Sequence, residues 1–250
     1  GPFGTLATSV QGMRELVEWV KSSIGGTLIT AEPDMTAVEW GSGWRASANT
    51  ILIPRTLILD LNKTEEELLA AMTKKTRQYI RKSERDGVVI RQVKSREDLT
   101  EVLAVYKDTA KRARFALHDD AYYYDLFDML SDSNLILGAY YENKLVSFVW
   151  NVISTATAFE LYGGMSEQGQ GLRANYALKW HAITKCKAWG IGRYDMNGLL
   201  NDGVSTFKEG FSDHEDMLAG TYDYPLSPLY TAWAKGLPAG KKIIRAIKNR

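Results

Sequence analysis

One segment of the chain carries polar side chains in a pattern that packing alone explains poorly. The segment 194–213, YDMNGLLNDGVSTFKEGFSD, leads from an expected strand through an Asn-Gly turn into a short helix. Its candidate functional groups are the carboxylate of Asp195, the amide of Asn197 and the ammonium group of Lys208. An ammonium group can stabilise a developing oxyanion, and a carboxylate can accept a proton. A Tyr-Asp pair at a strand end is also common as a purely structural feature.

A run of six cations within twelve residues is a second candidate site. The i, i+3, i+4 spacing that brings side chains to one helix face is followed by Lys74, Arg77, Arg81 and Arg85. We expect this run in the C-terminal half of one helix that begins with the acidic residues 65–67. The repulsion between the cations favours a bound anion, and Arg and Lys both suit phosphate. The alternative is a solvated face whose charges complement the helix dipole.

A glycine-rich turn before an amphipathic helix is a third candidate site. The stretch 166–180, SEQGQGLRANYALKW, nearly matches the pyrophosphate loop of acetyl-CoA-dependent N-acetyltransferases. Such a turn can hold phosphate because backbone N–H groups converge there and the helix dipole favours negative charge. The acetyltransferase pattern requires Gly or Ala where this chain has Arg173. An acetyl-CoA-dependent enzyme is therefore kept as an alternative.

Composition limits the classes to which the protein can belong. The chain has 250 residues, of which 45% are hydrophobic, with 31 basic and 30 acidic residues. That length fits one large or two modest domains. A net charge of +1 excludes a globally basic nucleic-acid coat, so affinity for polyanions must come from local clusters. The sequence has no run of 18 apolar residues and no signal peptide, which predicts a cytoplasmic protein.

The cysteine and the histidines do not indicate a metal site or a nucleophile. The single cysteine, Cys186, lies in an apolar helical pattern that is typical of a structural residue. The spacing of His118, His181 and His214 fits neither a catalytic triad nor a metal site. We expect no metal and no cofactor.

The order of the expected elements predicts an α/β fold. Strands are expected over 27–31, 49–60, 88–93, 134–142, 144–154, 156–164, 193–196 and 215–224. Helices are expected over 8–23, 97–113, 120–131, 174–190 and 204–208, from a capping box at Thr64 and Glu67, and twice near the C-terminus. A β-meander that leads into a glycine turn, a helix and another strand is the order of the N-acetyltransferase-like (GNAT-like) fold. In that fold two central strands splay apart and the acyl donor lies between them.

Three long segments carry a more specific resemblance. They are LDLNKTEEELLAAMTKKTRQYIRKSERDGV at 59–88, FELYGGMSEQGQGLRANYALKWHAITKCKAWGIGRYDMNG at 159–198 and FKEGF at 207–211. Together they resemble the Fem (FemABX) family of peptidoglycan-bridge aminoacyltransferases, in its armless, FemX-like branch. The resemblance implies two GNAT-like domains: a complete one over 57–227, and an N-terminally shortened first one whose remnant, 1–56, is completed by 228–250.

The resemblance implies an enzyme that takes Gly, Ala or Ser from aminoacyl-tRNA. The acceptor is the side-chain amine of the stem peptide in UDP-MurNAc-pentapeptide or lipid II. Phe207 and Lys208 match the family residues at the reacting end of the donor, and Asp195 is the third catalytic candidate. The implied substrate-binding residues are Lys74, Lys75, Thr76, Arg77, Tyr79, Arg81, Tyr162, Arg173, Asn175, Tyr176 and Asn197.

The chemistry of ester aminolysis suits these candidates. The ester of aminoacyl-tRNA is already reactive, so the enzyme needs only to orient the reactants, accept a proton and stabilise the oxyanion. Lys208 would bind the carbonyl oxygen or a terminal tRNA phosphate, and Asp195 would accept the proton. Two alternatives stay open: an acetyl-CoA-dependent N-acetyltransferase, and a non-catalytic module that binds the precursor or tRNA.

The C-terminal stretch 241–250, KKIIRAIKNR, predicts a basic amphipathic helix. Such a helix can face RNA, contact an anionic membrane at its surface, or form a solvated tail. Peripheral contact with the inner face of the bacterial membrane is one of the interpretations that this stretch leaves open.

Overall fold

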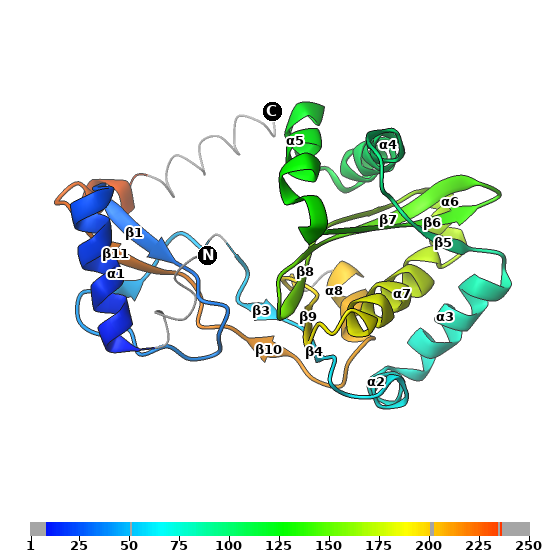
Figure 1. Ribbon diagram of the computed structural model, residues 1–250, viewed down its shortest axis with the longest axis horizontal. Helices are drawn as coiled ribbons and strands as arrows, with labels where there is room; N and C mark the ends of the chain where they lie inside the picture. The colour runs from blue at the N-terminus through cyan, green and yellow to red at the C-terminus, as the bar shows by residue number, and fades with distance from the viewer. Residues whose placement is uncertain (1–8, 51, 201–202, 235, 237–250) are drawn as a thin grey trace. The chain divides into compact units, whose positions relative to one another are not determined.

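The computed structural model describes residues 9–50, 52–200, 203–234 and 236 (Figure 1). The chain divides into two compact units, a smaller one of residues 1–56 and 216–250 and a larger one of Leu57–Glu215. The basic helix expected at 241–250 lies outside the described residues. The interpretation of the smaller unit as the remnant of a first GNAT-like domain stays a prediction.

The smaller unit is built on a short antiparallel sheet. Its elements are the helix α1 (Val10–Ser23) and the strands β1 (Leu28–Ala31), β2 (Arg45–Ala46), β3 (Arg55–Thr56), β10 (Asp216–Met217) and β11 (Tyr222–Pro225). The sheet has the order β1-β11-β2, and β3 pairs separately with β10. The buried carboxylate of Asp223 in β11 accepts hydrogen bonds from Thr30 at 2.9 Å and Ser47 at 2.6 Å. Asp223 therefore links the central strand β11 to β1 through Thr30 and to the residue after β2 through Ser47.

Two expected strands are broken in the structure. The strand expected over 215–224 is two strands, β10 and β11, which pair in different sheets and are separated by Gly220 at φ +83°. Both lie inside the expected domain 57–227 but pair with strands of the smaller unit. Within 49–60 the described strands begin only at Arg55, directly after Pro54. Proline has no N–H to donate to a ladder, so regular pairing starts beyond it.

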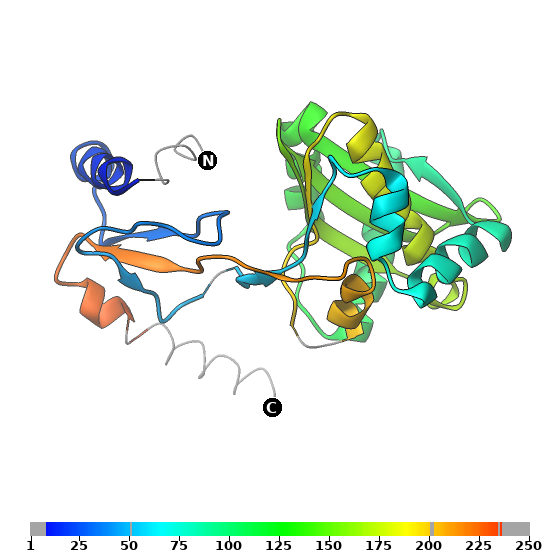
Figure 2. The same ribbon diagram turned by 90° about the horizontal axis from the view of Figure 1, so that it is seen from below.

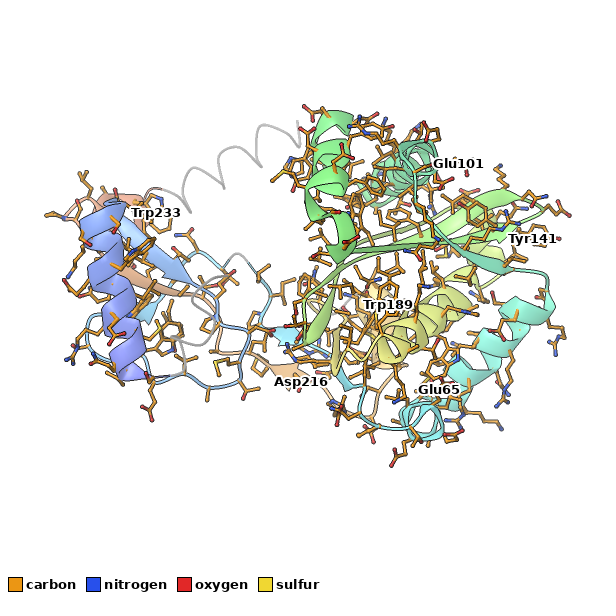
Figure 3. The ribbon with its side chains drawn as sticks, in the orientation of Figure 1. Glu65, Glu101, Tyr141, Trp189, Asp216 and Trp233 are labelled. Atoms are coloured by element: carbon orange, nitrogen blue, oxygen red, sulfur yellow. The ribbon has the colours of Figure 1, made fainter. Side chains whose placement is uncertain are left out.

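The larger unit contains a six-stranded sheet that is covered on both faces. Its strands are β4 (Ile58–Asp60), β5 (Val89–Gln92), β6 (Asn134–Tyr141), β7 (Lys144–Ile153), β8 (Thr157–Met165) and β9 (Arg193–Asp195), in the order β4-β9-β8-β7-β6-β5. Side chains of β6 alternate between two cores, with Leu135 and Leu137 on one face and Ile136 and Tyr140 on the other. Figure 3 shows side chains filling both sides of this sheet.

Helices form the two outer layers of the larger unit. They are α2 (Glu65–Ala71), α3 (Lys74–Arg85), α4 (Arg96–Ala113), α5 (Asp120–Leu130), the 3₁₀ helix η2 (Ser131–Ser133), α6 (Glu167–Gly171), α7 (Ala174–Ala188) and α8 (Gly203–Glu209). In Figure 1, α4 and α5 cover one face of the sheet, and α7 with α3 covers the other. The view from below in Figure 2 shows α2, α3 and α7 in front of the sheet.

The sheet opens between its only parallel neighbours, β8 and β9. These strands pair over three positions, from Thr157 opposite Arg193 to Phe159 opposite Asp195. Among the described residues, no strand pairs on that side with the rest of β8, residues 160–165. The two strands therefore splay as the GNAT-like fold requires, and the predicted α/β fold class is confirmed.

The expected single helix over the basic run is two helices. The capping box is present as predicted, with Thr64 accepting from Glu67 N at 3.2 Å, but α2 ends at Met72, whose ψ is 152°. Thr73 then caps α3. The cations therefore occupy the whole of α3, including its first turn at Lys74 and Lys75, where the helix dipole disfavours positive charge. Dipole complementarity does not explain that half of the cluster.

Arg77 holds the junction of the two helices, which gives a stability prediction. Its guanidinium Nη1 donates to Leu69 O at 3.0 Å and to Met72 O. Met72 O lies just past the end of α2, and Leu69 O accepts one further bond there, from Met72 N at 3.2 Å. Arg77→Ala should lower the free energy of unfolding by roughly 1–3 kcal/mol. Arg81→Ala, an exposed change on the same helix, should stay within about 0.5 kcal/mol. Equal losses for the two variants in guanidinium unfolding would contradict this role.

The glycine turn gives a second stability prediction. A Cβ on Gly169 would collide with the backbone oxygen of Val146 in β7, whereas a Cβ on Gly171 would meet nothing within 4 Å. Gly169→Ala should therefore cost about 1–3 kcal/mol through overpacking. Gly171→Ala should change stability by less than about 1 kcal/mol. Thermal unfolding of the two variants measures the difference, and similar behaviour would show that close packing does not require Gly169.

Candidate functional site

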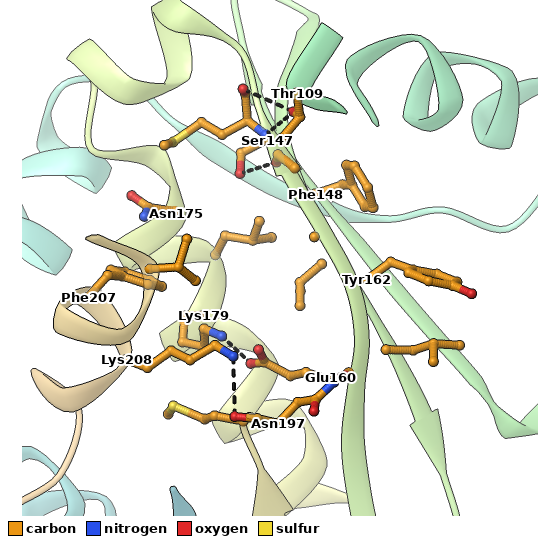
Figure 4. A pocket seen from close by; sticks show the side chains of 18 of the residues that line it. Thr109, Ser147, Phe148, Glu160, Tyr162, Asn175, Lys179, Asn197, Phe207 and Lys208 are labelled. Atoms are coloured by element: carbon orange, nitrogen blue, oxygen red, sulfur yellow. Dashed lines mark hydrogen bonds and ion pairs between the residues drawn. The ribbon is translucent and has the colours of Figure 1, made fainter. Parts of the chain in front are cut away.

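A cavity of about 570 Å³ opens in the larger unit where β8 and β9 splay. Its wall includes residues 160–165 of β8, the segment after β9, and side chains from α7 and α8 (Figure 4). Of the predicted site residues, it brings together Tyr162, Asn175, Asn197, Phe207 and Lys208. The position between splayed strands is the one that the fold class predicts for an acyl donor.

Lys208 reaches the cavity from a helix that aromatic residues anchor. Its ammonium nitrogen donates to the carbonyls of Asn197 at 3.3 Å and Gly198 at 3.1 Å. The adjacent Phe207 packs edge-on against Tyr176, with ring centroids 4.8 Å apart. This packing fixes α8, so the half-buried Lys208 is held at the turn that follows β9.

Asp195 lies behind the wall of the cavity and does not line it. The residue is 1% exposed, and its Oδ1 accepts a hydrogen bond from Asn197 N at 2.8 Å. Asn197 has φ +61°, a left-handed conformation that asparagine tolerates. Its side-chain Nδ2 donates to Glu160 O at 3.1 Å. Asp195 therefore shapes the turn that presents Asn197, in keeping with the structural alternative given above, and its role as a proton acceptor stays a prediction.

A buried ion pair on the cavity wall was missed by the sequence analysis. Lys179 of α7 and Glu160 of β8 form a salt bridge and are 5% and 8% exposed. The hydroxyl of the fully buried Tyr194 donates to Glu160 Oε1 at 2.7 Å. Burial, and then the charge of Glu160, raises the pKa of Tyr194 well above its usual value, so it stays a neutral donor. The sequence signal for a buried Lys179 was its spacing, because it lies three residues after Tyr176 on the expected apolar face of its helix.

Four predicted binding residues meet at the junction of α3 and α7. The ring of Tyr79 lies edge-on to Tyr176, with centroids 5.0 Å apart. The Arg173 guanidinium lies 4.9 Å and the Lys75 ammonium 5.7 Å from the centre of the Tyr79 ring. These are cation–π contacts, which position cations without neutralising them.

Three other predicted residues have side chains that are engaged within the fold, and two more stay exposed on α3. The Tyr162 ring points to the opposite face of the sheet (Figure 4), where it packs 5.5 Å from Tyr123, so only its main chain faces the cavity. Thr76 is 2% exposed and shares a hydrogen bond of 2.9 Å with Thr73. Arg77 is engaged by the end of α2. Lys74 and Arg81 remain exposed on α3.

The glycine turn uses its own N–H groups. It forms the five-residue helix α6, capped by Ser166, whose Oγ accepts from Gly169 N at 3.1 Å. Gln170 N donates to Ser166 O at 3.0 Å, and Leu172 N donates to Gln168 O at 3.0 Å. Because these donors are engaged within the chain, the turn does not present them to a phosphate. The pyrophosphate-loop interpretation of this stretch is therefore not supported by its hydrogen bonds.

Other chemistries find little support in the part of the chain that the structure describes. No group of three or more His, Cys, Asp or Glu residues there could hold a metal ion. Cys186 is buried, and burial raises the pKa of its thiol to about 12, as expected of a structural cysteine. None of the described helices is long and apolar enough to cross a membrane.

Known structures share this architecture. The crystal structure of FemX superposes with a TM-score of 0.79 and 16% identity, covering 93% of this chain and 80% of that one. The C-terminal domain of a putative lysylphosphatidylglycerol synthetase from Agrobacterium fabrum gives a TM-score of 0.62 and 12% identity, covering 92% of this chain and 78% of that one. At such low identity these likenesses establish the fold alone.

Sequence comparison gives the family. Among curated proteins, the aminoacyltransferase FemB of Staphylococcus epidermidis is 31% identical over 102 residues, which is 38% of this chain and 22% of FemB. The matched region thus spans about a fifth of that relative's length. The model of the FemAB family matches residues 34–146 and 142–237, which together make up most of the chain. The chain therefore belongs to the FemAB family.

Proposed function

We propose that the protein transfers an aminoacyl group from aminoacyl-tRNA to an amine of a peptidoglycan precursor. The observation that carries the proposal is the placement of Lys208 on a cavity between splayed strands, in a chain of the FemAB family. Its relative FemB is named an aminoacyltransferase. The transferred residue would be Gly, Ala or Ser, and the acceptor UDP-MurNAc-pentapeptide or lipid II.

The proposed reaction needs little covalent help from the protein. After losing one proton to solvent, the acceptor amine attacks the ester carbonyl carbon, and a new C–N bond forms. The bond from that carbon to the ribose oxygen breaks, and the ribose oxygen takes the second proton lost by the amine and leaves as a hydroxyl group. Lys208 would stabilise the oxyanion of the tetrahedral intermediate, while the cavity orients the two reactants. Phe207 would line the same end of the cavity.

The exposed cations of α3 would bind phosphate groups of a substrate. Lys74, Lys75 and Arg81 make no ion pair with any described residue, although Lys75 lies near the Tyr79 ring. Cations in the first turn of a helix are unfavourable unless an anion compensates them. The nucleotide-linked precursor and tRNA both supply such anions. The proposed setting is the cytoplasm, where aminoacyl-tRNA occurs, and contact with the membrane face is a further part of the proposal.

The proposed role of Lys208 leads to a kinetic prediction. Lys208→Ala should lower kcat/KM for aminoacyl transfer by roughly a hundred-fold or more, because the oxyanion loses its cationic partner. Lys63→Ala removes an exposed lysine outside the cavity and should transfer normally. Mass spectrometry of the acceptor measures both rates. Near-normal transfer by a stably folded Lys208→Ala protein would overturn the assignment.

The proposed role of α3 leads to a binding prediction. Lys74→Glu combined with Arg81→Glu should weaken binding of UDP-MurNAc-pentapeptide or tRNA by roughly tenfold at low salt and flatten its salt dependence. Lys111→Glu with Lys144→Glu changes the net charge equally at exposed sites on other elements. The control should bind as the parent does. Equal losses for both double variants would indicate a general charge effect, against a site on α3.

A further inference from the structure

Glu160 is a buried carboxylate with one oxygen still open to a ligand. Its Oε1 accepts hydrogen bonds from both Lys179 and Tyr194. Within the described residues, Oε2 has no hydrogen-bond partner, and the residue lines the cavity. A buried carboxylate costs free energy unless its charge and hydrogen-bonding capacity are satisfied. Lys179 compensates the charge of Glu160, and the open oxygen can still accept a hydrogen bond from a substrate donor.

Fold stability does not require an ion pair at this position. The residues that follow Lys179 on its face of α7, namely Ala182, Ile183 and Cys186, are all fully buried. In such surroundings a well-packed apolar pair is often as stable as an ion pair, or more stable. The Tyr194 hydroxyl, 2.7 Å from Glu160 Oε1 and 2.9 Å from Asn151 Oδ1, is a second donor group that restricts the direction in which the carboxylate points. An oriented charge at a cavity wall indicates a binding role.

The carboxylate stands close to the proposed reacting end of the cavity. Asn197 connects the two, since its Nδ2 donates to Glu160 O at 3.1 Å and its own carbonyl accepts from Lys208 at 3.3 Å. Figure 4 shows Lys179 and Lys208 both directed to the side of the cavity where Glu160 lies. One small substrate group that carries a carbonyl and a neighbouring ammonium can therefore contact Lys208 and Glu160 together.

We propose that Glu160 binds a primary ammonium group of a substrate, with Lys179 and Tyr194 as positioning residues for its carboxylate. The inference rests on the proposed function, which supplies two such groups. One is the α-ammonium of the aminoacyl donor, and the other is the side-chain amine of the acceptor. The cavity then selects substrates with a free amine over N-acylated analogues, because N-acylation leaves one neutral N–H where the ammonium offers three charged donors to the open oxygen of Glu160.

The test compares ligand pairs that differ only in this charge. The donor pair is the amide-linked analogue of alanyl-adenosine and its N-acetyl derivative. The acceptor pair is Nα-acetyl-lysine methylamide and its Nε-acetyl derivative. Calorimetry would measure the binding of all four by the parent chain and by the double variant Glu160→Gln/Lys179→Met, which removes both charges while keeping side-chain volume. Glu167→Gln, an exposed change on α6, is the matched control.

The parent and the control should bind the free amine of at least one pair roughly tenfold to a hundred-fold more tightly than its acetylated partner. The folded double variant should lose that preference, and the affected pair identifies which amine Glu160 binds. No preference in the parent, or an unchanged preference in the double variant, overturns the inference. A second assay measures aminoacyl transfer by the parent, with aminoacyl-tRNA as the donor. If the parent transfers the aminoacyl group but shows no amine preference, only this inference is contradicted. If the parent shows the preference but no transfer, only the proposed function is contradicted.

Discussion

The early end of the parallel pairing between β8 and β9 is the constraint on which the site depends. β9 ends after three paired positions, so the remaining part of β8 shows its main chain and alternate side chains to a cavity instead of to a neighbouring strand. An opening inside a sheet is stable only if other elements cover its polar groups. Here α7, α8 and the turn at Asn197 do so, and each places a polar side chain on the cavity wall.

The larger unit carries positive charge in two places, inside the cavity and on the exposed surface of α3. Lys208 and Lys179 lie inside the cavity, where the first is held by main-chain carbonyls and the second by Glu160. The cations of α3 lie outside, on a helix whose first turn opposes them. The inner pair suits a small reacting group, and the outer cations suit a phosphate chain that extends from it. A nucleotide-linked acyl donor or acceptor has both parts.

Sequence patterns predicted the elements that local chemistry determines. The capping box at Thr64, the three meander strands and the helix after the glycine turn depend on short-range spacing, and the structure contains them. The break at Thr73 was missed although threonine is a preferred N-cap, because the residues on both sides favour helix; the bonds from Arg77 and the close approach of Gly210 to Thr76 show it in the structure. The Glu160–Lys179 pair was also missed. It joins β8 to α7 across 19 residues of sequence, and the hydrophobic periodicity of each element assigns its position to an apolar face. Whether the Tyr162 ring points into the cavity or to the opposite face of the sheet depends on the register of β8 with β7, and the family resemblance gives no register.

The central claim is that this cavity joins an activated aminoacyl ester to a precursor amine. The most direct measurement incubates the full natural chain with Gly-, Ala- and Ser-tRNA and with UDP-MurNAc-pentapeptide and lipid II, and follows the acceptor mass. Our account predicts that at least one combination gains the mass of a single aminoacyl residue, and that omitting the charged tRNA abolishes the gain. Unchanged acceptor mass in every combination would contradict it.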